Sequence, residues 1–197
     1  MCNEDKIISL AKNNNGIITS KELAEKNIDS IYLTRLVNKN KLERIKNGLY
    51  VLPSTWGDEY FNLTYGNNAI FSYETALYFQ GLCETVPSSY NITVKRGYNG
   101  SLKNNEKVIL HYVDSNIFEL GRITIKSPQG QYISCYDKER CICELLSDKD
   151  NYDIETIKYA IIEYLSDKKE RDLPKLINYS KIFNVYNDVR KYLEVLM

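Results

Sequence analysis

The sequence predicts an α+β fold in two domains, and its 197 residues are enough for two small ones. Residues 16–52 carry two short helical patterns and then two apolar runs around Asn47-Gly48. Residues 72–136 mix one helical pattern with about four strand-like runs, and the patterns that follow Asp137 are helical. Pro53 opens a polar stretch, and proline cannot continue a central strand. We therefore predict domains at residues 1–55 and 56–197.

The first domain opens with a supporting helix over residues 4–14. Thr19 is expected to cap a second helix, because Glu22 follows at the spacing of a capping box. Asn27 and Ile28 form the turn after it.

A third helix is expected over about residues 30–38, with Asp29 as its cap. Apolar residues at i, i+3 and i+4 predict its buried stripe, which consists of Leu33, Leu36 and Val37. The opposite, outward face carries Ile31, Thr34, Arg35, Asn38 and Lys39, with Tyr32 on its flank.

Two apolar runs follow, at residues 42–45 and 49–52. Asn47-Gly48 between them is a hairpin signal, because both residues tolerate positive φ. Helix, turn, helix and hairpin in this order predict a winged helix-turn-helix domain, in which the hairpin is the wing.

This arrangement predicts double-stranded DNA as a partner, because the major groove admits an α-helix and distinguishes base pairs there. Residues 30–52 hold five cations and one anion, so five minus one gives a local +4 on a chain of zero net charge. Phosphate neutralisation needs such a patch. Two copies are expected on a promoter inverted repeat, since one winged helix reads few base pairs. The expected DNA-binding residues are Ser20, Lys21, Ser30, Tyr32, Thr34, Arg35, Asn38, Lys39, Lys41, Arg44, Lys46 and Asn47. A protein-docking module with merely solvated charges is the alternative.

The second domain is expected to begin with Ser72 as the cap of a helix that ends at Gly81. Its strands are predicted at residues 90–94, 108–113, 123–126 and 132–135. Lys95 and Arg96 open a basic, glycine-containing loop that could hold a phosphate, although an exposed turn is favoured.

A helical tail closes the chain. Asp137 caps a helix to about Leu146, and Asp153 and Asp172 begin two more helices. One face of the helix after Asp153 consists of Ile154, Ile157, Ala160, Ile161 and Tyr164. The last helix is expected to bury Val185, Val189, Tyr192, Leu193 and Leu196.

The inventory of reactive side chains argues against several classes of site. The five cysteines have no zinc-finger spacing, and His111 is the single histidine, so histidine-based metal clusters are excluded. Asp137 and Glu139 could bind a metal, but a structural role is favoured because Asp137 caps a helix. We expect no catalytic residue, no metal and no cofactor. No apolar run approaches a membrane span and the start is polar, so a cytoplasmic protein is expected.

The start of the second helix, Gly16-Ile17-Ile18-Thr19, and three longer segments resemble the AbiEi family of antitoxins, which belong to type IV toxin–antitoxin and abortive-infection systems. The first is Leu33-Thr34-Arg35-Leu36-Val37, followed by the wing that ends in Gly48-Leu49-Tyr50. The second is Ser72-Tyr73-Glu74-Thr75-Ala76-Leu77 with Gly81-Leu82, and the third is Asp137-Lys138-Glu139-Arg140.

The resemblance implies repression of the chain's own operon and neutralisation of a nucleotidyltransferase-like toxin without a stable complex. The antitoxin-domain motif expected here consists of Ser72, Tyr73, Lys95, Arg96, Asp137, Glu139 and Arg140. Tyr73 stands where many relatives have histidine, so a chemical role of that position is in doubt. The competing functions are a one-component regulator that senses a small ligand and an enzyme with a DNA-binding head. A nuclease would need a Glu-x-Lys arrangement, which we do not find.

Overall fold

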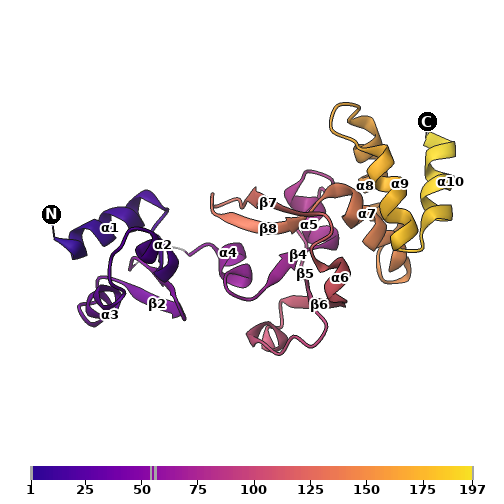
Figure 1. Ribbon diagram of the computed structural model, residues 1–197. Helices are drawn as coiled ribbons and strands as arrows, with labels where there is room; N and C mark the ends of the chain where they lie inside the picture. Colours follow the sequence, from indigo (N-terminus) through magenta and orange to yellow (C-terminus); the bar gives the residue numbers. More distant parts are fainter. Residues whose placement is uncertain (1, 54, 56, 197) are drawn as a thin grey trace. The chain divides into compact units, whose positions relative to one another are not determined.

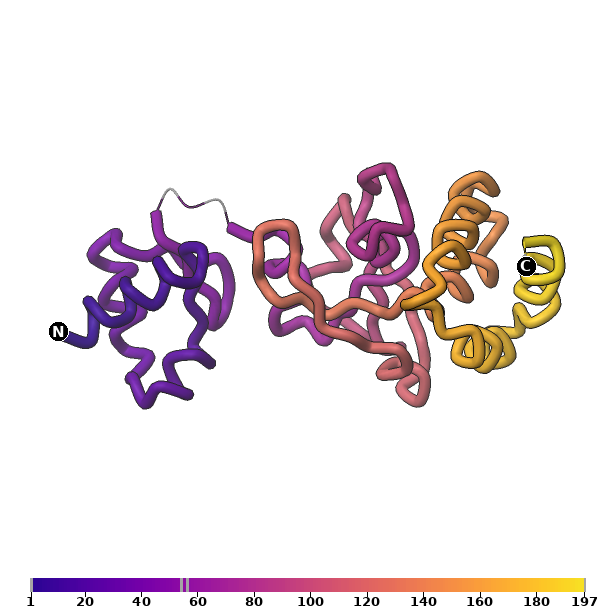
Figure 2. The backbone as a smooth tube through the Cα atoms, turned by 90° about the horizontal axis from the view of Figure 1, so that it is seen from above, coloured from indigo at the N-terminus to yellow at the C-terminus, as the bar shows by residue number. Residues whose placement is uncertain are grey.

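The computed structural model describes residues 2–53, 55 and 57–196. Contacts divide the chain into two compact units, Met1–Asn62 with Lys126–Tyr132 and Leu63–Ile125 with Ile133–Met197. The boundary predicted after Thr55 lies beside Ser54 and Trp56, which are outside the described residues. Figures 1 and 2 follow the chain from the N-terminal helices to the helical tail.

The first unit contains the predicted helices and hairpin together with one further strand (Figure 1). A three-stranded antiparallel sheet has the order β1-β3-β2. Strand β1 was not predicted, because three residues between two helices are too few to show an alternating pattern. The elements are α1 (Asn3–Asn13), β1 (Ile17–Thr19), α2 (Ser20–Glu25), α3 (Ile31–Asn38), β2 (Glu43–Lys46) and β3 (Leu49–Val51).

Local signals behave as the sequence predicted. Thr19 Oγ1 accepts a hydrogen bond from Glu22 N at 3.2 Å, and Glu22 Oε2 accepts one from Thr19 N at 2.8 Å. Asp29 Oδ1 accepts a hydrogen bond from Ile31 N at 2.8 Å, although the N-cap position itself is Ser30. The predicted hairpin forms, with Gly48 at φ +75°, but Asn47 does not adopt a positive φ, and the register shifts between Arg44 and Lys46.

The core of the first unit forms where the apolar stripes meet. Leu33 and Leu36 of α3 are fully buried, and Val37 is partly buried. They share one cluster with Ile7 and Ala11 of α1. Burying this side of α3 leaves its other side free for solvent.

The second unit is built on a mixed five-stranded sheet of order β6-β5-β4-β8-β7, where about four strands were expected. The additional strand β4 (Ala69–Phe71) lies at the centre and is fully buried. Three buried residues give neither alternation nor length, so the sequence pattern did not reveal it. The other strands are β5 (Tyr90–Lys95), β6 (Val108–Val113), β7 (Arg122–Lys126) and β8 (Tyr132–Tyr136).

Helices α5 and α6 contact strand β5, and the later helices form the tail, which Figure 2 shows in orange and yellow. Two short helices, α4 and α6, were not predicted. Among the described residues, no helix is long and apolar enough to span a membrane. The helices are α4 (Glu59–Thr64), α5 (Tyr73–Phe79), α6 (Ser115–Phe118), α7 (Lys138–Ser147), α8 (Ile154–Ser166), α9 (Leu173–Ile182) and α10 (Tyr186–Leu196), with 3-10 turns at Ser101–Asn104 and Lys149–Asn151.

In the helical tail the predicted helix caps are confirmed, but not every residue expected to be buried is buried. Asp137, Asp153 and Asp172 each accept a backbone hydrogen bond at the start of a helix. Leu196 was expected to be buried and is 42% exposed, because it lies in the last turn of α10. Ile154, in the first turn of α8, is likewise 49% exposed. A terminal turn has helical neighbours at one end only, so its apolar side chains are less buried. Periodic spacing in the sequence does not show this difference.

Candidate functional site

The outward face of α3 is the most distinctive surface of the first unit. Thr34, Arg35 and Asn38 are all exposed on it, as predicted. Ile31, the first residue of the helix, is 49% exposed. The helix therefore offers one apolar, two neutral polar and one cationic side chain to a partner.

Arg35 lies against an aromatic ring. Its guanidinium carbon is 5.2 Å from the ring centroid of Tyr32, which is partly buried. A cation over an aromatic face is attracted by the ring quadrupole, and the contact restricts a long side chain. Arg35 is thus held at the surface in a limited range of conformations.

Lys39, at the end of α3, is paired within the unit. Its Nζ lies 2.7 Å from Glu4 Oε1 and 2.8 Å from Glu4 Oε2 of helix α1. The lysine side chain remains 53% exposed, while that of Glu4 is 18% exposed. The expected phosphate contact by Lys39 therefore competes with an internal carboxylate.

The wing presents Arg44 and Asn47 to solvent, joined by a 3.0 Å hydrogen bond from Arg44 Nη2 to Asn47 Oδ1. Lys46 is different. It is partly buried, and its Nζ donates to the carbonyl of Asn62 at 2.5 Å. Burial lowers the pKa of the Lys46 ammonium. Lys46 thus has a structural partner where the sequence suggested a free cation.

The remaining expected residues lie at the surface as well. Lys21, Ser30 and Lys41 are exposed, and Ser20 is partly buried. Ile31 was placed on the outward face by the sequence but was left out of the expected DNA-binding residues, because it is apolar. Its helical spacing of four residues from Arg35 was the signal that could have included it.

A second candidate site lies in the second unit, around Tyr73. Its ring stacks on that of His111, with centroids 3.8 Å apart and planes 22° apart. Tyr152 is stacked 5.5 Å from Tyr73 at 15°. Asn91 Oδ1 joins the outer two rings, at 2.9 Å from His111 Nε2 and 3.0 Å from the hydroxyl of Tyr152.

The backbone and ionisation of this ring stack are both unusual. Tyr73 has φ +50°, a conformation that costs free energy in a residue with a side chain. Burial lowers the pKa of His111 to about 4 and raises the pKa of Tyr73 and of Tyr152. The histidine is therefore neutral at physiological pH. A cavity of about 300 Å³ opens beside His111, Tyr152 and Asn91.

A buried ion pair on helix α7, between Arg140 and Glu144, is linked to the backbone of Tyr73. Arg140 is completely buried, and its Nε lies 2.9 Å from Glu144 Oε1. Glu144 Oε2 accepts a 3.3 Å hydrogen bond from the amide of Tyr73, so the ion pair joins α7 to α5. Ser72 is also fully buried, and its side chain makes no capping hydrogen bond in the described structure. These motif residues therefore act from inside the unit.

Asp137 and Glu139 belong to a neighbouring buried network. Asp137 Oδ1 caps α7 by accepting from Arg140 N at 3.0 Å. Glu139 accepts from the hydroxyl of Tyr164 at 3.0 Å, and Lys175 Nζ lies 3.0 Å from Glu139 Oε2 and 3.4 Å from Asp137 Oδ2. In the part of the chain that the structure describes, no group of three or more His, Cys, Asp or Glu could hold a metal ion.

Lys95 and Arg96 have partners of their own. Arg96 Nε pairs with Asp114 at 2.9 Å, and Lys95 Nζ lies 5.0 Å from the ring centroid of Phe118. Across residues 2–53, 55 and 57–196, no hydrogen bond or ion pair links either cation to Tyr73 or Arg140. The structure therefore joins Ser72, Tyr73 and Arg140 and leaves the basic loop apart.

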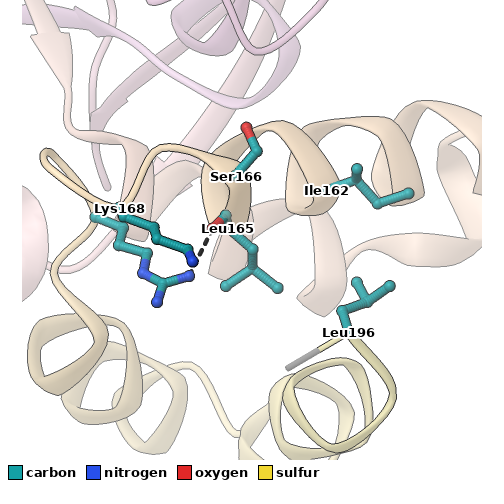
Figure 3. Close-up of a pocket in the computed structure, with 6 residues that line it drawn as sticks. Ile162, Leu165, Ser166, Lys168 and Leu196 are labelled. Carbon is teal, nitrogen blue, oxygen red and sulfur yellow. Dashed lines mark hydrogen bonds between the residues drawn. The ribbon is translucent and has the colours of Figure 1, made fainter.

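The helical tail also has a partly apolar hollow of about 410 Å³ between α8 and α10 (Figure 3). Ile162 and Leu196 line it and are 47% and 42% exposed. Arg171 Nη1 donates to the carbonyl of Leu165 at 2.6 Å at its other side. No titratable cluster of the kind seen around Tyr73 accompanies this hollow in the described residues.

Comparison with known proteins finds a family that matches the first unit. Residues 5–53 match a family model described as "Transcriptional regulator, AbiEi antitoxin". No curated protein matches the chain. Among solved structures, the RV2827C protein from Mycobacterium tuberculosis is similar, with a TM-score of 0.54 and 10% identity over 90% of this chain and 72% of that chain. At that identity the likeness is one of fold.

Proposed function

We propose that this chain is an autorepressor and antitoxin, since its residues 5–53 match the family model of AbiEi antitoxins and transcriptional regulators. It represses the promoter of its own operon and counteracts a nucleotidyltransferase-like toxin of a type IV toxin–antitoxin system. Its place of action is the cytoplasm, where promoter DNA is available.

The observation that carries the DNA-binding role is the exposed face of α3. Its side chains are neither packed into the core nor all apolar, and Arg35 is held in place by Tyr32. The segment from residue 30 to 52 carries a formal charge of +4, of which Arg35, Lys41 and Arg44 are exposed. Lys39 is paired with Glu4, and Lys46 donates to Asn62. A helix of this kind can read base edges in the major groove, while neighbouring cations neutralise phosphates.

The bound form on DNA is a pair of copies on an inverted repeat. The exposed face of α3 spans eight residues at most, from Ile31 to Asn38. One such helix reads too few base pairs to find a unique promoter among competing genomic sites. Half-sites one helical turn apart, or a multiple of it, would place both helices on one side of the duplex.

The antitoxin role belongs to the second unit, with a functional boundary after Thr55. The ring stack of Tyr73, His111 and Tyr152 and the buried Arg140–Glu144 pair give this part an integrated core of its own. Residues 56–197 carry −3, since residues 1–55 carry nine cations minus six anions and the whole chain is neutral. An acidic domain suits a basic partner that handles RNA, through transient contact and without a stable complex.

Two readouts in one strain test the proposal. The full chain is expressed with its partner toxin beside a reporter fused to its own promoter. Arg35→Ala should relieve repression and leave rescue from the toxin intact, because Arg35 lies on the DNA-binding face. Arg122→Ala, which removes a 39% exposed arginine from β7, is the matched control and should alter neither. Loss of rescue in Arg35→Ala would show that antitoxicity depends on DNA binding.

A ligand-sensing regulator is the second candidate. The observation that favours it is the cavity of about 300 Å³ beside His111 and Tyr152, next to a strained backbone at Tyr73. A ligand there would alter repression by the full chain on purified promoter DNA. Repression that is the same in purified protein and in cell extract would count against a sensor.

A further inference from the structure

Ile31 occupies a position that the general DNA-binding role does not explain. It is the first residue of α3 and is 49% exposed. A single exposed isoleucine is ordinary on a protein surface. This one lies three and four residues before Thr34 and Arg35, so it shares their face of the helix.

The backbone at Ile31 is fixed by a hydrogen bond, and its β-branched side chain has few rotamers. Asp29 Oδ1 accepts a hydrogen bond from the backbone amide of Ile31 at 2.8 Å, which fixes the start of the helix. A β-branched side chain has one strongly preferred χ1 rotamer in a helix. The exposed methyl groups of Ile31 therefore start from a fixed backbone position, at the end of α3 that enters a groove first.

Only one feature of the major groove suits such a side chain. Isoleucine has no hydrogen-bond donor or acceptor, and the one apolar group that base pairs display there is the C5 methyl of thymine. We propose that Ile31 reads a thymine in each half-site by packing against this methyl group. The inference rests on the proposed DNA-binding function and adds its base specificity.

Arg35 sets where the next base contact falls. Its guanidinium, restrained 5.2 Å from the Tyr32 ring centroid, suits the bidentate contact that arginine makes with guanine O6 and N7. Four helical residues advance about 6 Å along the axis, and bases on one strand are about 3.4 Å apart. For a helix that lies along the groove, the half-site should therefore contain a thymine and a guanine about two base steps apart.

Removing single methyl groups from DNA tests this directly. Duplexes that the full chain retains from a random pool define the half-site, and each thymine is then replaced in turn by deoxyuridine. One thymine per half-site should weaken binding about three- to fivefold on losing its methyl group, the value of one buried apolar carbon. Arg35→Ala should remove the preference for the guanine nearby.

Variants of Ile31 test whether this residue is the one that senses the thymine methyl group. Ile31→Ala should bind the thymine and uracil duplexes equally, and Ile31→Val should keep part of the difference. Ile162→Ala, at a 47% exposed isoleucine of the second unit, is the matched control and should keep all of it. The inference is overturned if no thymine is sensitive, or if Ile31→Ala still prefers thymine. A chain that retains no sequence from the pool would instead refute DNA recognition itself.

Discussion

Glu4 of α1 holds Lys39, the residue that caps the end of α3, in an ion pair of 2.7 Å at the edge of the outward face. The pair joins α1 to the end of α3, 35 residues away in sequence. The positive charge of Lys39 is therefore already balanced by a carboxylate of the protein. Lys39 must exchange this carboxylate for a phosphate if it is to contribute to DNA binding.

Removing the carboxylate should therefore strengthen DNA binding. We expect Glu4→Gln to raise affinity about two- to fivefold at low salt, on promoter and random DNA alike, because a surface ion pair is worth little more than this. Gel-shift titrations at several salt concentrations measure it. Glu25→Gln, an exposed glutamate of α2, is the control, and Glu4→Gln in a Lys39→Ala background should gain nothing.

Lys46 should behave as a structural residue. Its Nζ donates to Asn62, and burial lowers its pKa, so its charge is poorly placed for a phosphate. Lys46→Met should lower the melting temperature and leave the salt dependence of DNA binding nearly unchanged. Lys41→Met, at an exposed position, should reduce the slope of log K against log salt by about one instead. If Lys46→Met reduced the salt dependence and Lys41→Met did not, Lys46 would be a DNA-contacting residue after all.

His111 should make the second unit sensitive to acid. Its folded-state pKa of about 4 lies below its ordinary value of 6.5, so the unfolded chain takes up the proton more readily. The stability it contributes is present above pH 6.5 and is lost as the pH falls toward 4, an effect on the order of 2–3 kcal/mol. Urea unfolding at a series of pH values measures this loss. His111→Phe keeps a ring in the stack and should flatten that part of the profile.

Arg140 should be the most costly residue to truncate in the second unit. Arg140→Ala leaves Glu144 as a buried carboxylate without its cation, and breaking a buried pair costs about 3–5 kcal/mol. Arg140→Met with Glu144→Leu removes both charges and should recover much of the loss. Denaturant unfolding measures the free energy of unfolding of the two variants. Equal destabilisation would show that the packing of Arg140 on Tyr136, 3.3 Å from the ring centroid, dominates.

The sequence by itself determined the features that depend on neighbours within four residues. Thr19 and Glu22 specify a capping box, and aspartates specify the starts of four helices. The spacing of Leu33 and Leu36 fixes which side of α3 is buried and hence which side is exposed. Short-range hydrogen bonds and helical periodicity suffice for these, so the exposed face of α3 could be predicted.

Tertiary structure decided the contacts between residues far apart in sequence. The central strand β4 is three residues long and is recognisable only by its pairing with β5 and β8. The pairing of Lys39 with Glu4, the contact of Lys46 with Asn62 and the stack of Tyr73 on His111 leave no periodic trace in the sequence. Such contacts depend on which surfaces the fold brings together, because packing and charge pairing act through space.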